Sequence, residues 1–166
     1  MSINIKLLFM DVDGTLTDGK IYMSSQGELF KAFDIKDGCG VHDLLPQAHI
    51  IPVVLTARQS AIVQNRCQEM GVTHYYQGCR DKEAKLAELA EEFGLSPDIK
   101  GIYQEIAYIG DDIMDLPCMR RCGVVGCPAD AVDEVREIAH FVSTKNGGNG
   151  AVREFIEWII VLEMGE

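Results

Sequence analysis

The sequence predicts an α/β fold, in which a doubly wound, mostly parallel sheet is covered by helices on both faces. Short apolar runs alternate along the chain with stretches of helical periodicity, which is typical of βαβ units. Runs such as residues 7–10 and 50–55 have no polar face, so they fit strands that are buried on both sides. We find no linker or internal repeat, and we expect one domain over residues 1–166.

The strands and helices of this fold can be located in order. We expect strands at residues 7–10, 50–55, 73–76, 105–109, 123–126 and 141–142. Helical spacing predicts helices at residues 41–47, 59–70, 82–93, 113–121, 131–139 and 151–163, with an interruption near Pro117. Gly71 and Gly94 follow two of these segments directly, where helices commonly end.

Residues 19–33 depart from this alternation and predict a small β-hairpin flap. Two apolar segments flank the turn-forming residues 24–27. Two strands alone bury little, so we expect Ile21, Met23, Leu29 and Phe30 to be exposed. No other insertion looks large enough to form a cap domain over a site.

Composition excludes several classes of partner. The chain carries 15 Lys and Arg against 26 Asp and Glu, a net charge of −11, which argues against nucleic-acid and anionic-membrane binding. Apolar runs are too short for a membrane span, and the first residues lack the charged start of a signal peptide. We therefore predict a cytoplasmic protein, whose six cysteines, without a C-x-x-C pair, are reduced thiols.

Polar side chains gather where the predicted strands end or a helix begins. Asp11 and Asp13 follow the first strand two residues apart, so strand alternation puts both carboxylates on one side. Equivalent places later in the chain hold Thr56 with Arg58, Lys82, and Asp111 with Asp112. Singly, several of these could be helix caps or solvated side chains. Together, they form the inventory for phosphoryl transfer with Mg²⁺.

The same motifs carry a resemblance to a known superfamily. Asp-Val-Asp-Gly-Thr at 11–15, Leu-Thr-Ala-Arg at 55–58, Asp-Lys at 81–82 and Gly-Asp-Asp-Ile-Met-Asp at 110–115 resemble the haloacid dehalogenase superfamily of phosphatases. Residues 33–40, 110–117 and 147–154 are similar to one of its branches, the 3-deoxy-D-manno-octulosonate 8-phosphate phosphatase family. The resemblance extends over nearly the whole chain.

The resemblance implies roles for the strand-end residues. Asp11 would be the nucleophile that forms an aspartyl-phosphate, and Asp13 would protonate the leaving alkoxide and later deprotonate water. Thr56 would bind the phosphate, and Lys82 would neutralise its developing charge.

A Mg²⁺ cofactor is implied as well. The Asp11 carboxylate, the Asp13 backbone carbonyl and Asp111 would hold the ion. Asp112 and Asp115 would hold these ligands in place without binding the ion themselves, and for Asp115 a direct ligand role stays open.

The implied substrate is a keto-deoxy sugar acid phosphate, most closely 3-deoxy-D-manno-octulosonate 8-phosphate from lipopolysaccharide biosynthesis. Its contacts would be Asp34, Ile35, Lys36, Asp37, Gly38, Arg58, Arg66 and Lys82. Arginines suit a ligand with both a carboxylate and a phosphate, although Arg66 could also lie on a solvated helix face. His42 stands where relatives carry arginine and Thr15 where valine is common, and the former leaves the sugar open.

Two alternatives remain at this stage. A phosphatase for nine-carbon keto-sugar acid 9-phosphates would share this scaffold, and a receiver-type phospho-acceptor module also combines acids, a threonine and a lysine. The motif order, with the Asp-x-Asp first and the second acid pair after the lysine, favours the phosphatase. With no lid in its own chain, the site needs a neighbouring subunit to cover it, and the resembled family is tetrameric, so we expect a homotetramer.

Overall fold

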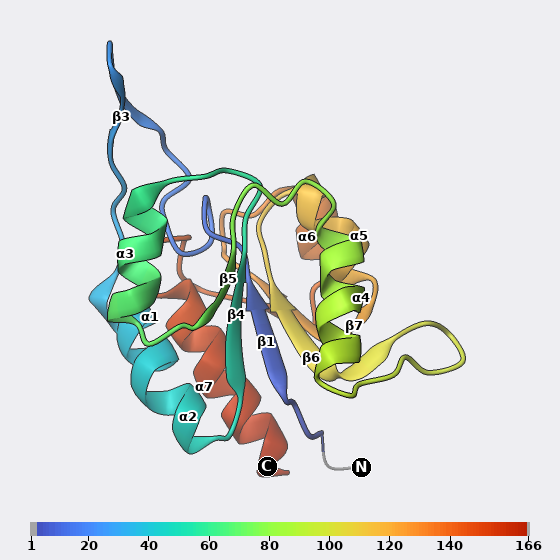
Figure 1. Cartoon of the computed structure of the whole chain (residues 1–166). Helices are drawn as coiled ribbons and strands as arrows, with labels where there is room; N and C mark the ends of the chain where they lie inside the picture. Colours follow the sequence, from blue (N-terminus) through green and yellow to red (C-terminus); the bar gives the residue numbers. More distant parts are fainter. Residues whose placement is uncertain (1–2, 166) are drawn as a thin grey trace.

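Within residues 3–165, which the computed structural model describes, a six-stranded parallel sheet forms the centre of the molecule (Figure 1). Its strand order is β5-β4-β1-β6-β7-β8. The strands are β1 (Leu7–Met10), β4 (Ile51–Leu55), β5 (His74–Tyr76), β6 (Tyr103–Ile109), β7 (Cys122–Cys127) and β8 (Phe141–Val142). The first strand in sequence is central, since Leu7 is in register with Ile51 on one side and Ile106 on the other.

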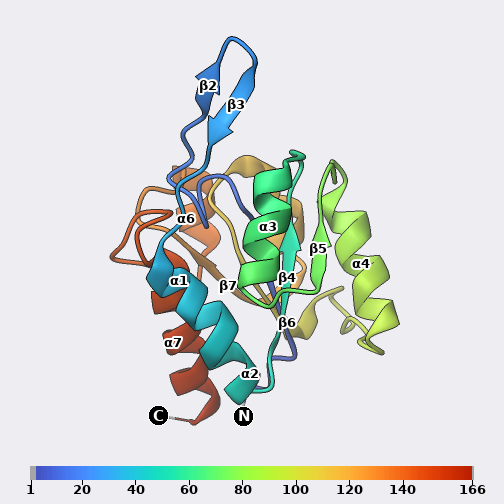
Figure 2. The same cartoon turned by 60° about the vertical axis from the view of Figure 1, so that its left-hand side comes forward.

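Helices cover both faces of this sheet (Figures 1 and 2). One face carries α1 (Ile35–Cys39), α2 (Leu45–Gln47), α3 (Ala61–Glu69) and α7 (Ala151–Glu163). The other carries α4 (Lys82–Glu92), α5 (Leu116–Met119) and α6 (Asp133–Ile138). Alternation along β1 sends Leu8 and Met10 into the first core and Leu7 and Phe9 into the second. The predicted doubly wound α/β fold is confirmed.

The helix expected at residues 41–47 begins earlier than the sequence indicated. α1 starts at Ile35, where the side chain of Asp34 accepts a hydrogen bond from the Lys36 amide, and a π-helical turn (Gly40–Leu44) joins it to α2. Gly38 suggests a turn, but it lies inside the helix. A Cβ there would stand 2.3 Å from Nη2 of Arg66, so a larger residue would displace the end of that side chain.

The segment after β6 agrees more closely with the prediction from the sequence. A 3₁₀ turn (Ile113–Asp115) precedes α5, and the side chains of Asp112 and Asp115 form a capping box around it. Pro117 lies in the first turn of α5, where a missing amide proton costs nothing.

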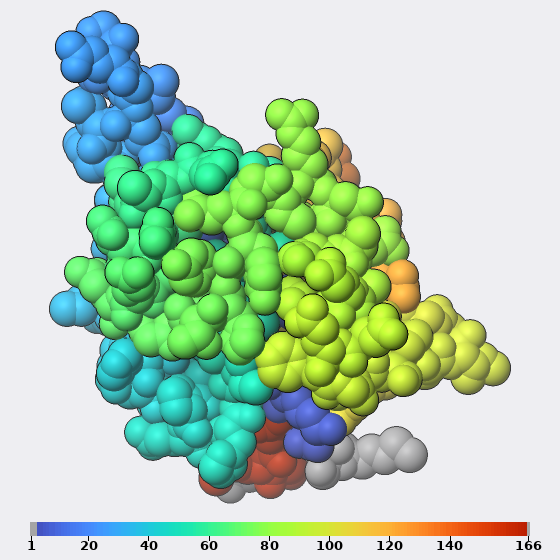
Figure 3. All heavy atoms as spheres, in the orientation of Figure 1, coloured from blue at the N-terminus to red at the C-terminus, as the bar shows by residue number. Residues whose placement is uncertain are grey.

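The hairpin consists of β2 (Tyr22–Ser24) and β3 (Gly27–Phe30) and stands clear of the body of the molecule (Figures 2 and 3). It rises from the edge of the sheet at which the strands end (Figure 1). Its four large apolar side chains are 45% to 59% exposed, as predicted: Ile21, Met23, Leu29 and Phe30. None of the helices formed by residues 3–165 combines the length and the apolar character that crossing a bilayer requires.

Candidate functional site

The predicted catalytic residues meet at one edge of the sheet. Asp11 follows β1, Thr56 follows β4 and Asp111 comes two residues after β6, and these three strands are parallel neighbours. Lys82 reaches the same edge from the first position of α4. The carboxyl ends of parallel strands are the usual ligand site of open α/β sheets.

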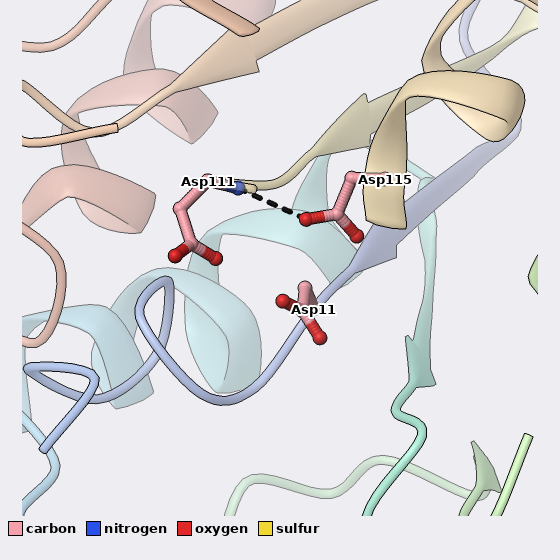
Figure 4. A group of neighbouring side chains, drawn as sticks. All are labelled: Asp11, Asp111 and Asp115. Atoms are coloured by element: carbon pink, nitrogen blue, oxygen red, sulfur yellow. Dashed lines mark hydrogen bonds between the residues drawn. The ribbon is translucent and has the colours of Figure 1, made fainter. Parts of the chain in front are cut away.

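Three carboxylates and a lysine form the centre of this site. Oxygen atoms of Asp11, Asp111 and Asp115 all lie within 4.8 Å of one another, and the first two side chains point toward each other (Figure 4). The ammonium of Lys82 is 2.9 Å from Oδ1 of Asp11 and 2.9 Å from Oδ1 of Asp115. Asp11, Asp115 and Lys82 are buried and Asp111 is half-buried, and the three acids outnumber the one cation.

Burial and mutual repulsion shift the protonation equilibria of these groups. Burial, followed by the charge of Asp115, raises the pKa of Asp11 well above its usual range, although Lys82 opposes the shift. Burial and Asp115 raise the pKa of Asp111 to about 6. Burial lowers the pKa of Lys82, but the charges of Asp11 and Asp115 outweigh it, so the net shift is upward and the lysine stays charged. The site therefore carries excess negative charge that a cation would relieve.

Asp115 holds the other groups in place. Its Oδ1 accepts hydrogen bonds from Lys82 and from the Tyr108 hydroxyl, the latter at 2.7 Å. Its Oδ2 accepts from the backbone amide of Asp111 at 3.1 Å (Figure 4) and from that of Asp112 at 3.3 Å. These bonds use the four lone-pair positions of a carboxylate. The loop after β6 is thus fixed by one buried side chain.

Asp13 lies beside this cluster and contacts the hairpin. Its Oδ1 is 2.5 Å from Nζ of Lys31 and 4.0 Å from Nη1 of Arg58. Both cations also pair with Glu28, at 3.1 and 3.3 Å. The sequence analysis did not identify Lys31 or Glu28 as site residues. The sequence feature that could have indicated them is that each is a charged residue beside apolar residues in the second half of the hairpin.

The glycine-rich segment 146–150 packs against the turn after Asp13. A Cβ on Gly147 would stand 1.9 Å from the carbonyl oxygen of Gly14, and the Gly148 amide donates to the carbonyl of Thr15 at 3.1 Å. Gly14 itself has a φ of 90° and lies against the Asp111 carboxylate. The Thr15 hydroxyl donates to Oδ1 of Asp111 at 3.0 Å. The segment thus supports the turn that carries Asp13.

The other predicted substrate contacts lie apart from Asp11. Arg66 donates to the carbonyl of Asp34 at 3.3 Å and pairs with Glu69. A pocket of about 230 Å³ adjoins it, lined by Ile35, Gly38, Cys39, His42, Asp43, Arg66, Glu69 and Met70. Lys36 borders a different hollow near Arg153. The carboxylate of Asp37 is buried and accepts the backbone amide of Arg153 at 2.9 Å. Within a single chain, the predicted site residues therefore line three places: the cluster at the strand ends, the pocket beside Arg66 and the hollow beside Lys36.

Comparison with known proteins gives consistent results, although no family model matches the chain. The 3-deoxy-D-manno-octulosonate 8-phosphate phosphatase KdsC of Escherichia coli is 38% identical over 160 residues, which cover 96% of this chain and 81% of that protein. A crystal structure of the phosphatase of that name from Moraxella catarrhalis, in complex with magnesium, phosphate and KDO, superimposes with a TM-score of 0.89 at 38% identity, covering 99% of this chain and 90% of that chain. A haloacid dehalogenase superfamily (subfamily III A) hydrolase from Legionella pneumophila has a TM-score of 0.89 at 37% identity, and the match covers 98% of this chain and 86% of that chain.

Proposed function

Because the chain belongs to the 3-deoxy-D-manno-octulosonate 8-phosphate phosphatase family of the haloacid dehalogenase superfamily, we propose that it hydrolyses that sugar acid phosphate with Mg²⁺ as cofactor. The observation that carries the proposal is the largely buried group of Asp11, Lys82, Asp111 and Asp115 at the edge of the sheet where β1 and β6 end. It combines a nucleophile, a cation and excess negative charge. A receiver module is not supported, because the similar proteins are phosphatases and hydrolases.

The reaction has two displacements at phosphorus. An oxygen of Asp11 attacks the phosphorus while the bond to the sugar oxygen breaks, and Asp13 gives that oxygen a proton. Asp13, now a carboxylate, then takes a proton from a water that attacks the aspartyl-phosphate. This second displacement releases inorganic phosphate and restores Asp11.

The donor set fits Mg²⁺. Hard oxygen ligands and excess negative charge are what this ion requires, and the Asp11 carboxylate, the Asp13 carbonyl and Asp111 would hold it. When bound, it neutralises charge between the anionic nucleophile and the phosphate. Asp115 orients the loop that carries Asp111 and is not a ligand in this scheme, because its oxygens already accept four hydrogen bonds.

Lys82 and Thr56 complete the phosphate site. The ammonium of Lys82 lies 2.9 Å from an Asp11 oxygen, so a phosphate approaching that carboxylate comes within its reach. Thr56 stands at the end of the neighbouring strand β4 and donates its hydroxyl to a phosphate oxygen. Arg58, tied to Glu28, borders the entrance on the hairpin side.

Asp11→Asn tests the proposed function. The variant keeps the side-chain size but cannot form the aspartyl-phosphate, so phosphate release from 3-deoxy-D-manno-octulosonate 8-phosphate should fall below about a hundredth of the wild-type rate. EDTA should abolish the wild-type rate, and added Mg²⁺ should restore it. Residual turnover above that level, or equal rates with EDTA and Mg²⁺, would contradict the mechanism. A nine-carbon 9-phosphate assayed in parallel would show which sugar acid is preferred.

The proposal also includes the assembly. We infer a homotetramer of single-domain subunits in the cytoplasm, in which the exposed apolar residues of the hairpins pack together. Arg66 and residues 34–38 lie apart from Asp11 in one chain, so a neighbouring subunit would bring them to the sugar. Light scattering at micromolar concentration measures the mass. A fully active monomer of 18.4 kDa would rule this assembly out.

A further inference from the structure

The side chain of Lys31 is enclosed at the base of the hairpin. It is 1% exposed, and its ammonium lies 2.5 Å from Asp13 and 3.1 Å from Glu28. Burying an ammonium costs several kcal/mol unless it is paired closely. The hairpin stands clear of the body along most of its length, and its large apolar side chains are exposed. The enclosed side chain of Lys31 is therefore an exception within the hairpin. The burial of this ammonium is compensated by its pairing with Asp13 and Glu28, and the shorter of the two contacts is the one to Asp13.

The contact engages only one oxygen of Asp13. Within residues 3–165, the hydrogen bond to this side chain goes to Oδ1, and the side chain remains 20% exposed. A carboxylate held at one oxygen has a fixed orientation, and its second oxygen stays available to a ligand. Correct orientation of Asp13 should increase the rate of hydrolysis by a large factor, because proton transfer requires its oxygen to come close to the leaving oxygen.

We propose that Lys31 is a positioning residue, which holds Oδ1 of Asp13 so that Oδ2 meets the oxygen of the leaving alkoxide; this inference rests on the phosphatase function proposed above. Glu28 extends the arrangement, since it pairs with both Lys31 and Arg58. Once Asp13 has given up its proton, the four side chains carry two positive and two negative charges, so the two cations balance the two carboxylates. The base of the hairpin thereby sets the orientation of the group that transfers the proton.

The role predicts a dependence on the leaving group. When the ester bond of a sugar phosphate breaks, the alkoxide oxygen takes the proton from Asp13, and poor orientation of Asp13 slows this step. The nitrophenolate of p-nitrophenyl phosphate leaves as a stable anion and needs no proton. Misplacing Asp13 should therefore slow the first substrate much more than the second.

The test compares kcat/KM for these two substrates in Lys31→Met. We expect a loss of about 10- to 100-fold with 3-deoxy-D-manno-octulosonate 8-phosphate, and of less than about threefold with p-nitrophenyl phosphate. Lys20→Met is the matched control, since Lys20 lies exposed in the other leg of the hairpin and should leave both values unchanged. Circular dichroism checks the fold. If the single variant is unstable, Lys31→Met with Glu28→Gln removes one charge of each sign and should show the same contrast.

A double-mutant cycle with Asp13→Asn separates positioning from direct binding. If Lys31 acts through Asp13, adding Lys31→Met to Asp13→Asn should change kcat/KM by less than about twofold. A further tenfold loss would mean that Lys31 binds the substrate itself. Equal losses on both substrates, or no loss on either, would also overturn the proposal. Wild-type protein that hydrolyses neither substrate would instead overturn the phosphatase function.

Discussion

Asp115 accepts hydrogen bonds from the Lys82 ammonium, the Tyr108 hydroxyl and two backbone amides, and no part of its side chain is exposed. Asp115→Asn would turn one acceptor oxygen into a donor that faces other donors. We expect a loss of about 3 kcal/mol in unfolding free energy. Depending on which oxygen is replaced, either the buried ammonium of Lys82 or the backbone amides of Asp111 and Asp112 lose their acceptor. Turnover should fall as well, since Lys82 loses one of its two anchors.

Urea unfolding and phosphate release measure both effects of Asp115→Asn. The control is Asp112→Asn, which changes an exposed neighbour that caps only the 3₁₀ turn, at a cost of about 1 kcal/mol or less. If the two variants are equally stable, Asp115 does not organise the site.

The convergence of polar residues could be predicted where each of them follows the end of a strand. Asp11, Thr56 and Asp111 come directly after apolar runs or within two residues of them, so their convergence could be predicted from a parallel sheet. Lys31 and Glu28 could not be found this way. Their contacts with Asp13 and Arg58 depend on how the hairpin returns over the sheet edge, which no local pattern specifies.

At the scale of elements, Asp37 joins α1 to the start of α7. Its buried carboxylate accepts the Arg153 amide at 2.9 Å, and burial raises its pKa from 3.8 to about 6. The native state thus binds the proton more tightly than the unfolded chain. The stabilisation from protonation is complete below about pH 4 and is lost as the pH rises through about 6.

We therefore expect the wild type to lose about 1 kcal/mol relative to Asp37→Asn between pH 5 and pH 7.5. Asparagine stays neutral, so its contribution does not vary with pH. Urea unfolding of both proteins at the two pH values gives the difference. A constant difference would show that Asp37 has the same pKa in the folded and unfolded chains.

Most elements could be predicted from periodicity, and the main departure has a tertiary cause. The apolar periodicity located every strand of the sheet within two residues at each end. The helix that starts at Ile35 was expected only from residue 41, because Gly38 and Gly40 usually break helices. In the folded chain, Arg66 and Ile156 pack where their side chains would be. Close packing between elements far apart in sequence has no local signature.

At the scale of the whole molecule, a cation that binds only the folded protein stabilises it. Mg²⁺ at about a hundred times its dissociation constant should add about 2.7 kcal/mol. For a chain of this size, that corresponds to a rise of about 5–10 °C in Tm. Calorimetry with Mg²⁺ and with EDTA measures the shift, and Asp111→Asn should reduce it strongly. Equal Tm values in the wild type would contradict a cation site that includes the carboxylates of Asp11 and Asp111.

The central place of β1 has a consequence for how the chain folds. Its partners β4 and β6 come from residues 51–55 and 103–109, so the first strand pairs only with segments made much later. Such distant pairings slow folding. During synthesis β4 can pair with one edge of β1 early, but the other edge stays unpaired until β6 has been made, at about two thirds of the chain. An incomplete chain that ends before β6 would present one edge of β1 to other chains, and unprotected edges of this kind aggregate.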